Sequence, residues 1–122
     1  MKSTTQKGRE AEQLALEWLQ KRGFALLERN YRVGHKEIDL IVESRSFIHI
    51  VEVKALSAPT AMDPSRRVDA HKRQLLASAA NYWLRSHSAL KEAQFDIVTV
   101  LFSDTGPQLE YIPNAFYPIY YK

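Results

Sequence analysis

Hydrophobic residues recur every three or four positions in two segments of the chain, and this spacing predicts two helices. In residues 7–22 the apolar positions form one stripe, made of Ala11, Leu14, Ala15, Trp18 and Leu19. Gly23 follows this segment as a natural C-terminal stop. Residues 69–87 carry a second stripe, on or beside which lie Lys72, Leu75, Leu76, Ala79, Ala80 and Trp83. Each predicted helix therefore has an apolar face to bury.

Alternating or β-branched segments predict five strands, over residues 24–32, 36–43, 46–54, 95–102 and 108–112. In residues 36–43 the alternation places Ile38, Leu40 and Val42 on one face and Glu37, Asp39 and Ile41 on the other. The continuous β-branched run of residues 46–54 suits a central strand that is covered on both faces. Ser44 and Arg45 predict a short hairpin link, which pairs residues whose numbers sum to about 89.

The order of these elements is helix, three strands, helix, two strands. Residues 56–68 contain Pro59 and Pro64 and read as a loop before the second helix. Strands joined by short links form an antiparallel meander, and a helical crossover places the next strand parallel to its neighbour. The pattern predicts an α/β fold class, with a mixed sheet flanked by helices, in one domain over residues 1–122. The aromatic tail, residues 116–121, is expected to pack on the core.

Composition narrows the class of protein without revealing its function. The chain has no cysteine, which excludes disulfides, thiolate metal sites and cysteine nucleophiles. No apolar run approaches the roughly 20 residues of a membrane-spanning helix, and residues 1–10 lack the apolar core of a signal peptide. We therefore expect a soluble, cytoplasmic protein without a membrane partner. The net charge of +3 is compatible with a polyanionic partner.

Three charged residues stand inside runs of apolar residues, where charges are disfavoured. They are Asp39 in the second predicted strand and Glu52 and Lys54 in the third. Side chains two apart on a strand share a face, so Glu52 points the same way as Lys54, and Glu37 the same way as Asp39. In the predicted register Asp39 opposes Ile50, and Glu52 lies one side-chain step further along the same face.

A carboxylate in such a position needs a partner, and a hard divalent cation such as Mg²⁺ or Mn²⁺ is a suitable one. A cation held by Asp39 and Glu52 would stabilise charge on a scissile phosphate and lower the pKa of a bound water. Lys54 would orient or activate that water, or offset phosphate charge. The alternative is an exposed ion pair between Glu52 and Lys54, which an isolated E-x-K motif by itself would favour.

Two clusters of basic residues are candidates for contact with a nucleic-acid backbone. The denser one adjoins the predicted loop and comprises Arg66, Arg67, His71, Lys72 and Arg73. The weaker one comprises Arg29, Arg32, His35 and Lys36. Either could instead be a solvated run of charges, and Lys72 could cover core surface with its aliphatic stem.

Several strings of the chain, in order and over nearly its whole length, resemble the YraN-like family of uncharacterised bacterial proteins. They are Gly8-Arg9-Glu10-Ala11-Glu12, Gly23-Phe24, Arg29-Asn30-Tyr31-Arg32, Glu37-Ile38-Asp39-Leu40-Ile41, Val51-Glu52-Val53-Lys54, Phe95-Asp96-Ile97-Val98 and Asn114-Ala115-Phe116. The family pattern is similar to that of the PD-(D/E)xK restriction-endonuclease-like superfamily and its Holliday-junction-resolvase-like members. The resemblance implies a restriction-endonuclease-like core, αβββαβ, in agreement with the order of elements above.

The resemblance also implies roles for individual residues. Asp39 matches the metal-binding aspartate, Glu52 the second carboxylate and Lys54 the catalytic lysine of the superfamily. Glu12 matches the helix glutamate that joins the metal site in resolvase-like members, and Glu37 matches the first acid of the family's G-E-I-D-L-I string.

The chain departs from the family pattern at two places. Lys36 stands where the family usually has glycine, and Ala55-Leu56 replace the usual Thr-Arg after Lys54. The second change removes a hydroxyl and a guanidinium that would contact phosphate, which argues for a lower affinity for the substrate.

The sequence therefore predicts an endonuclease, dependent on Mg²⁺ or Mn²⁺, that hydrolyses phosphodiester bonds of DNA, with branched or damaged DNA as candidate substrates. One alternative is a module of the nuclease fold that binds nucleic acid without cutting it. Another is a structural or interaction protein in which the acidic cluster is merely tolerated. A symmetric homodimer would be expected if the substrate is a four-way junction.

Overall fold

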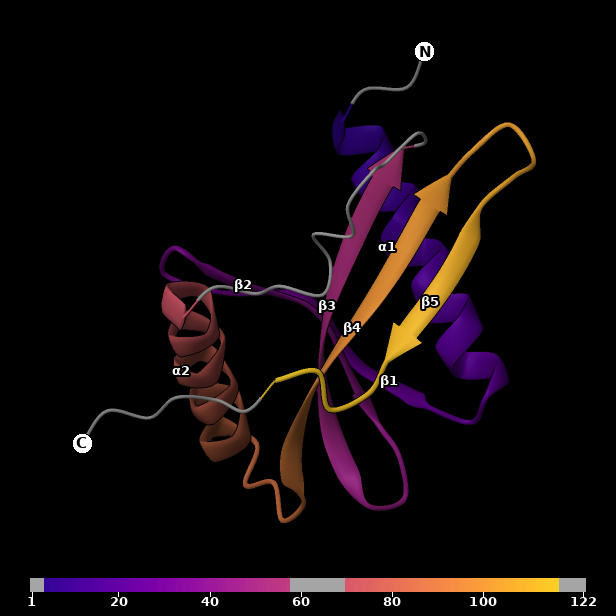
Figure 1. Cartoon of the computed structure of the whole chain (residues 1–122). Helices are drawn as coiled ribbons and strands as arrows, with labels where there is room; N and C mark the ends of the chain where they lie inside the picture. The colour runs from indigo at the N-terminus through magenta and orange to yellow at the C-terminus, as the bar shows by residue number, and fades with distance from the viewer. Residues whose placement is uncertain (1–3, 58–69, 117–122) are drawn as a thin grey trace.

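A computed structural model describes residues 4–57 and 70–116 of the chain. Within these ranges a five-stranded sheet lies between two helices (Figure 1). The elements are α1 (Thr4–Lys21), β1 (Ala25–Val33), β2 (Lys36–Glu43), β3 (Phe47–Ser57), α2 (Ala70–Ser86), β4 (Glu92–Phe102) and β5 (Gln108–Ile112). This arrangement confirms the α/β fold class and is consistent with the expected αβββαβ core, to which β5 is added.

The strands lie in the order β1-β2-β3-β4-β5, so each strand is beside its neighbours in the chain. Strands β1, β2 and β3 form the expected antiparallel meander. Strand β4 follows α2 and pairs parallel to β3, and β5 then returns antiparallel to β4. The helical crossover thus makes β3 the central strand, with a partner on each side.

Neighbouring residues of β3 and β4 point to opposite faces of the sheet, and each face is covered by one helix. Ile50 and Ile97 pack with α2 residues in one buried cluster, while Val51 and Val98 pack with α1 residues in the other. The residues contributed by α1 are Ala11, Ala15, Leu16 and Leu19, and those contributed by α2 are Leu76, Ala77, Ala79, Ala80 and Trp83. The predicted stripes of both helices are therefore the surfaces that they bury.

Helix α1 ends at Lys21, and the glycine that follows it supplies the stop that the sequence predicts. Gly23 has a φ of 93°, a left-handed conformation that glycine adopts without steric cost. Its amide donates to Gln20 O at 3.0 Å, and the amide of Phe24 donates to Leu19 O at 3.2 Å. These two bonds cap the last turn in the Schellman arrangement and direct the chain into β1.

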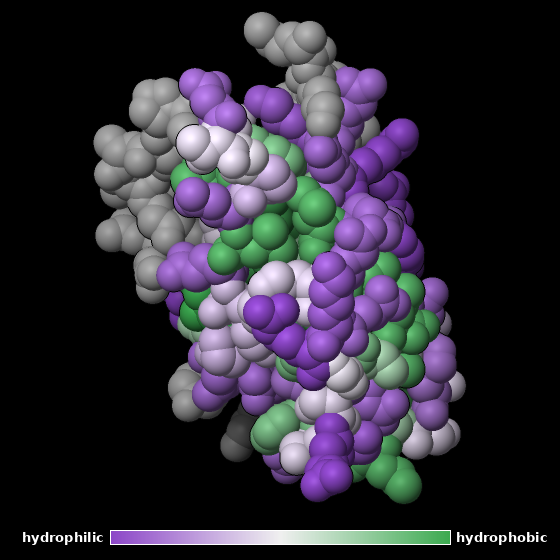
Figure 2. All heavy atoms as spheres, turned by 90° about the vertical axis from the view of Figure 1, so that its right-hand side faces the viewer, coloured by the Kyte–Doolittle hydropathy of each residue, from purple (hydrophilic) through white to green (hydrophobic). Residues whose placement is uncertain are grey.

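Partly buried residues line the edge of the α1-side cluster, among them Leu14, Phe102 and Leu109. Figure 2, which views the molecule from the side of β5, accordingly shows hydrophobic surface between hydrophilic residues. Neither helix in the described part of the chain has the length and apolar character needed to cross a membrane.

The register between β2 and β3 differs from the predicted one by two residues. Leu40 pairs with Val51 and Ile41 with Ile50, because the link comprises residues 44–46 rather than two residues. The Ser44 amide donates to Phe47 O at 3.0 Å, and the Ser44 hydroxyl accepts from the Phe47 amide at 3.3 Å, which closes the wider link. This register carries Asp39 to the level of Glu52 instead of Ile50.

Strand β2 separates from β3 beyond Leu40. Its recorded pairs with β3 end at Leu40, whereas its pairs with β1 continue to Lys36. The first half of β2 leaves the central strand and runs toward α2 (Figure 1). Because the strand turns here, Ile38 packs in the α2-side cluster with Ile41, and the prediction that Ile38 shares a face with Leu40 is wrong.

Other predicted boundaries shift at the ends of elements. Leu56 and Ser57 belong to β3 rather than to the predicted loop, whose residues 58–68 lie outside the described residues. Strand β4 begins at Glu92, three residues before the predicted start, because its first residues continue the parallel pairing with β3. Phe116 of the aromatic tail is buried in the core, and residues 117–121 lie outside the described range.

A buried carboxylate, Asp96, links β3, β4 and β5 on the α1 face of the sheet. It accepts hydrogen bonds from His49 Nδ1 at 2.6 Å, Tyr111 OH at 2.7 Å, the Asn114 amide at 2.9 Å and Gln94 Nε2 at 3.0 Å. Burial alone would raise the pKa of Asp96, but the donors, His49 foremost, outweigh it and hold the pKa below its usual range. Asp96 and His49 therefore have a structural role.

We predict that Asp96→Asn destabilises the protein by about 3 kcal/mol, because the donors around Asp96 lose their charged acceptor in a buried site. Urea unfolding at pH 7 measures the change. Asp104→Asn, in the exposed turn after β4, is the matched control and should change stability by less than about 0.5 kcal/mol. Equal stabilities for the two variants would contradict the structural role of Asp96.

The destabilisation caused by Asp96→Asn should disappear at acid pH. Because the folded pKa of Asp96 lies below the unfolded value of about 4, its stabilisation is complete above that value and is lost as the pH falls through the folded pKa. The difference in unfolding free energy between the wild type and Asp96→Asn should therefore shrink below about pH 4. A difference that grows with acidity would show that the sign is wrong.

Candidate metal centre and active site

The candidate site begins where β2 leaves β3. Val51 is the last recorded β3 partner of β2, and the amide of Val53, two residues further, donates to Asp39 Oδ2 at 2.8 Å. Residues two apart on a strand direct their amides to the same side, so this amide would otherwise face a β2 carbonyl. The Asp39 carboxylate takes the place of the missing backbone acceptor and is thereby held at the fork between the strands.

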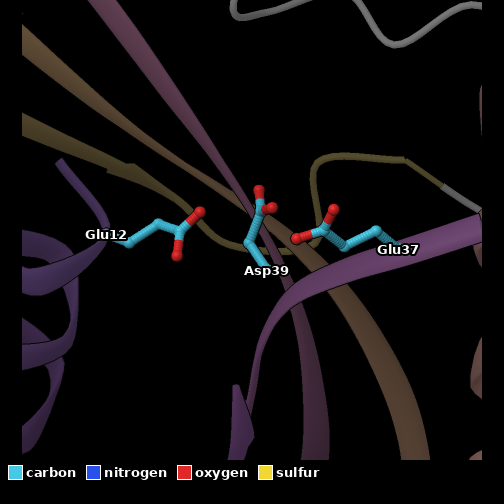
Figure 3. Close-up of side chains that lie close together, drawn as sticks. All are labelled: Glu12, Glu37 and Asp39. Carbon is cyan, nitrogen blue, oxygen red and sulfur yellow. The ribbon is translucent and has the colours of Figure 1, made fainter. Parts of the chain in front are cut away.

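Two further carboxylates meet Asp39 at this point. Glu12 reaches it from α1 and Glu37 from β2, and their side chains point toward Asp39 from opposite sides (Figure 3). One oxygen from each of the three groups lies within 4.8 Å of the others, and all three residues are half-buried. Helix α1 and strand β2 therefore together form one partly exposed acidic group.

The spacing of these oxygens fits a divalent cation. Mg²⁺ holds its oxygen ligands octahedrally at about 2.0–2.1 Å, so neighbouring ligands lie about 3 Å apart and opposite ligands about 4 Å apart. Because at most one pair among three ligands can be opposite, the three carboxylates, within 4.8 Å of one another, need to close by up to about 2 Å, which rotation of the side chains can provide. Three oxygen ligands also leave coordination positions for water or a phosphate oxygen. The residues that could hold such an ion are Glu12, Glu37 and Asp39. Two of them are predicted metal ligands, whereas Glu37 takes the place in the group that the sequence assigned to Glu52.

Glu52 lies beside this group and interacts with Asp39. Burial raises the pKa of Asp39 to about 9, helped by its hydrogen bond to Glu52 and by the negative charges of Glu52 and Glu12. Burial would also raise the pKa of Glu52, but Asp39 and Lys72 reverse this effect and lower it. In the absence of a cation, Asp39 therefore carries the proton of the pair and donates it toward an ionised Glu52.

Two lysines balance the charge of Glu52. Lys72 Nζ, from the first turn of α2, lies 2.7 Å from Glu52 Oε2, and Glu52 is only 7% exposed. Burial opposes the charge on Lys72, but the contact with Glu52 raises the pKa of Lys72 above its usual value. Burial lowers the pKa of Lys54, and the positive charge of Lys72 adds to this effect. Lys54 is thus closer to losing its proton than an exposed lysine.

A cleft of about 390 Å³ opens over the acidic group, between the β1–β2 hairpin and α2. Glu37, Asp39 and Glu52 line it on the acidic side. Its other lining residues are His35, Lys36, His71, Lys72, Leu75 and Leu76. The cleft therefore joins carboxylates that suit a cation to basic groups that suit a phosphate, a combination expected of a site for phosphate esters.

The residues predicted for nucleic-acid contact have different surroundings. Lys72 lines the cleft, whereas Arg73 is not among its lining residues and has its guanidinium carbon 5.5 Å from the centre of the Phe116 ring. Arg66 and Arg67 lie outside the described residues. The cleft instead takes His35 and Lys36 from the second, weaker basic cluster.

Sequence reasoning gave no role to Asn30, which contacts two of the three carboxylates. Its Nδ2 donates to Glu12 Oε1 at 2.8 Å and to Glu37 Oε1 at 3.2 Å. A signal was present, because asparagine is disfavoured within strands and Asn30 stands in the middle of β1. The contact itself could not be seen, since it depends on how α1 packs beside β1 and β2.

Comparisons with known proteins place these residues in a family context. The sequence model of the family described as "Uncharacterised protein family UPF0102" matches residues 11–100. A UPF0102 protein of Anaeromyxobacter dehalogenans is 37% identical over 110 residues, which cover 89% of this chain and 82% of that protein. A UPF0102 protein of Geobacter metallireducens is 36% identical, with 89% and 90% covered. Another, from Flavobacterium psychrophilum, is also 36% identical, with 90% and 92% covered.

We predict that Asp39→Asn changes the pH dependence of stability when metal is removed with EDTA. Because the folded pKa of Asp39 is about 9, above the unfolded value, its favourable contribution is complete below about pH 4 and is lost as the pH rises through 9. Asparagine keeps an acceptor for Val53 and a donor for Glu52 but cannot ionise.

Relative to the wild type, Asp39→Asn should therefore gain more than about 1.4 kcal/mol between pH 5 and pH 9, the equivalent of one pKa unit. Urea unfolding at both pH values measures the gain, with Asp104→Asn as the control. A difference between variant and wild type that does not change with pH would contradict the raised pKa of Asp39.

Proposed function

The chain belongs to protein family UPF0102, and we propose that it is a metal-dependent phosphodiesterase that cuts nucleic acid, with DNA as the first candidate. The observation that carries the proposal is the convergence of Glu12, Glu37 and Asp39 at one end of a cleft whose other wall is basic. An acidic group alone would be common on a protein surface. Its combination with a buried, paired Glu52 and a lysine of lowered pKa is typical of a reactive site.

Each residue of the site would have a distinct task. Glu12, Glu37 and Asp39 would hold Mg²⁺ or Mn²⁺, which when bound supplies positive charge for the scissile phosphate and acidifies a water. Asp39 would give up its proton as it becomes a ligand, so metal affinity should rise with pH. Glu52 would accept a hydrogen bond from that water or act as a further ligand once Asp39 is deprotonated.

The two lysines would act on the substrate and the water. Lys54 shares a strand face with Glu52, from which it would orient the attacking water, and its lowered pKa brings it closer to the neutral form that could accept a proton. Lys72 and Lys36 would contact phosphate oxygens on either side of the scissile bond, because both line the cleft. The basic contacts that Ala55 and Leu56 do not provide would thus come from the hairpin and from α2.

The substrate class that we propose is branched or damaged DNA. A cleft of about 390 Å³ is at the lower end of the range of pockets that bind small molecules, so it has room for a short stretch of one strand. Unpaired nucleotides at a branch or lesion reach such a cleft at little cost, because the strand does not first have to separate from its complement.

The alternative of a binding module is favoured by one observation, the ion pair between Lys72 and Glu52. In that case Lys72 permanently neutralises the acid that a nuclease would use, and the cleft only holds a phosphate backbone. DNA binding that persists in EDTA, with no cleavage in Mg²⁺ or Mn²⁺, would favour this second function.

We predict that Glu12→Gln and Asp39→Asn each lower metal-dependent cleavage by at least about 100-fold, because each removes a charged ligand without changing side-chain size. Cleavage of labelled four-way, flap, single-stranded and duplex DNA in Mn²⁺ measures the loss. Glu17→Gln, on the exposed side of α1, is the matched control and should cut like the wild type. Wild-type rates in both Glu12→Gln and Asp39→Asn would remove the site from the reaction.

A second prediction concerns the basic wall of the cleft. Lys36→Gln should weaken DNA binding in EDTA and lower the slope of log affinity against log salt by about 1, because one phosphate contact is lost. Lys21→Gln, at the exposed end of α1, is the control and should leave the slope unchanged. Equal slopes for the two variants would mean that the hairpin does not contact the backbone.

A further inference from the structure

Asn30 occupies an unusual position for a residue inside a strand. On either side of it Arg29 pairs with Leu40 and Tyr31 with Ile38, so Asn30 is level with Asp39. Its φ is 51°, in the left-handed region that few residues other than glycine adopt. Asparagine is among the residues that tolerate this conformation, whereas a β-branched residue would be strained. The backbone of β1 therefore favours asparagine or glycine here.

The side chain of Asn30 connects the two outer carboxylates of the acidic group. Its amide nitrogen has two hydrogens, and the two acceptors within reach are Glu12 Oε1 at 2.8 Å and Glu37 Oε1 at 3.2 Å. Glu12 belongs to α1 and Glu37 to β2, so no backbone hydrogen bond of the sheet sets their separation. Asn30 is the side chain that spans between them.

A neutral donor suits this task better than a cation would. Carboxylates at such distances repel one another and would rotate apart, which a bridging donor opposes. A lysine here would cancel the negative charge and compete with a metal ion for the same oxygens. The exposed contact of Arg32 with Glu37 Oε2, at 3.4 Å, is longer and weakly held, so a bound cation can replace it.

We propose that Asn30 is a positioning residue that holds Glu12 and Glu37 at the separation needed to bind a divalent cation together with Asp39. The inference rests on the proposed function, because it assumes that the acidic group binds metal. The left-handed conformation of Asn30 would serve the same purpose, because it places the side-chain amide between α1 and β2.

The test compares Asn30→Gly with Asn30→Ala. Glycine removes the side chain and accepts the positive φ, whereas alanine removes the same contacts and strains the backbone. Titration calorimetry with Mn²⁺ should show binding about 10-fold weaker in both variants, as expected when a residue that orients metal ligands is lost. The melting temperature should fall in Asn30→Ala but stay within about 5 °C of the wild type in Asn30→Gly.

Cleavage kinetics add a readout that a purely structural role would not move. In Asn30→Gly the Mn²⁺ concentration for half-maximal cleavage should rise about 10-fold, and saturating Mn²⁺ should restore most of kcat. Wild-type Mn²⁺ affinity in Asn30→Gly would overturn the role of Asn30 and leave the metal site standing. No Mn²⁺ binding by the wild type, with or without DNA, would overturn the proposed function and the positioning role with it.

Discussion

The separation of β2 from β3 beyond Leu40 is the constraint on which the rest of the site depends. A fork in a sheet leaves backbone amides without strand partners, and a buried amide without an acceptor costs about 1–3 kcal/mol. Asp39 removes this cost by accepting from Val53. The carboxylate of Asp39 is therefore held in place by the backbone amide of Val53. The first half of β2, which is separated from β3, forms the walls of the cleft together with α2.

Holding Asp39 in place creates an excess of negative charge. Glu12, Glu37 and Glu52 gather around it, and within the described residues Lys54 and Lys72 lie near enough to Glu52 to offset its charge. Asp39 relieves the repulsion by retaining its proton, because burial and the neighbouring carboxylates raise its pKa to about 9. A divalent cation at this position would offset the negative charge of the carboxylates more completely than a single proton does. The electrostatics of the fold and the proposed affinity for a divalent cation thus have one origin.

Asp96, which is buried, and Asp39, which is half-buried, show how surroundings separate an acid that stays charged from one that retains its proton. Asp96 is surrounded by donors, among them His49 and Tyr111, so its charge is fully satisfied and its pKa falls. Within the described residues Asp39 accepts from one backbone amide, and it is partly buried beside other carboxylates, so its pKa rises. Both stand between apolar residues in their strands, and their local sequences alone do not distinguish them. Their roles follow from what packs against them.

The two helices, the five strands, their order and the family could all be predicted from the amino-acid sequence, because periodic burial and helix-ending signals are local properties. The sequence also marked Asp39, Glu52 and Lys54, since charges inside apolar strands are conspicuous. The register of β2 against β3, the turn that moves Ile38 to the α2 face, and the contacts of Asn30 with Glu12 and Glu37 became visible only in the folded structure. These features depend on the closure of a three-residue link and on the packing of α1 beside the hairpin, which join residues far apart in the chain.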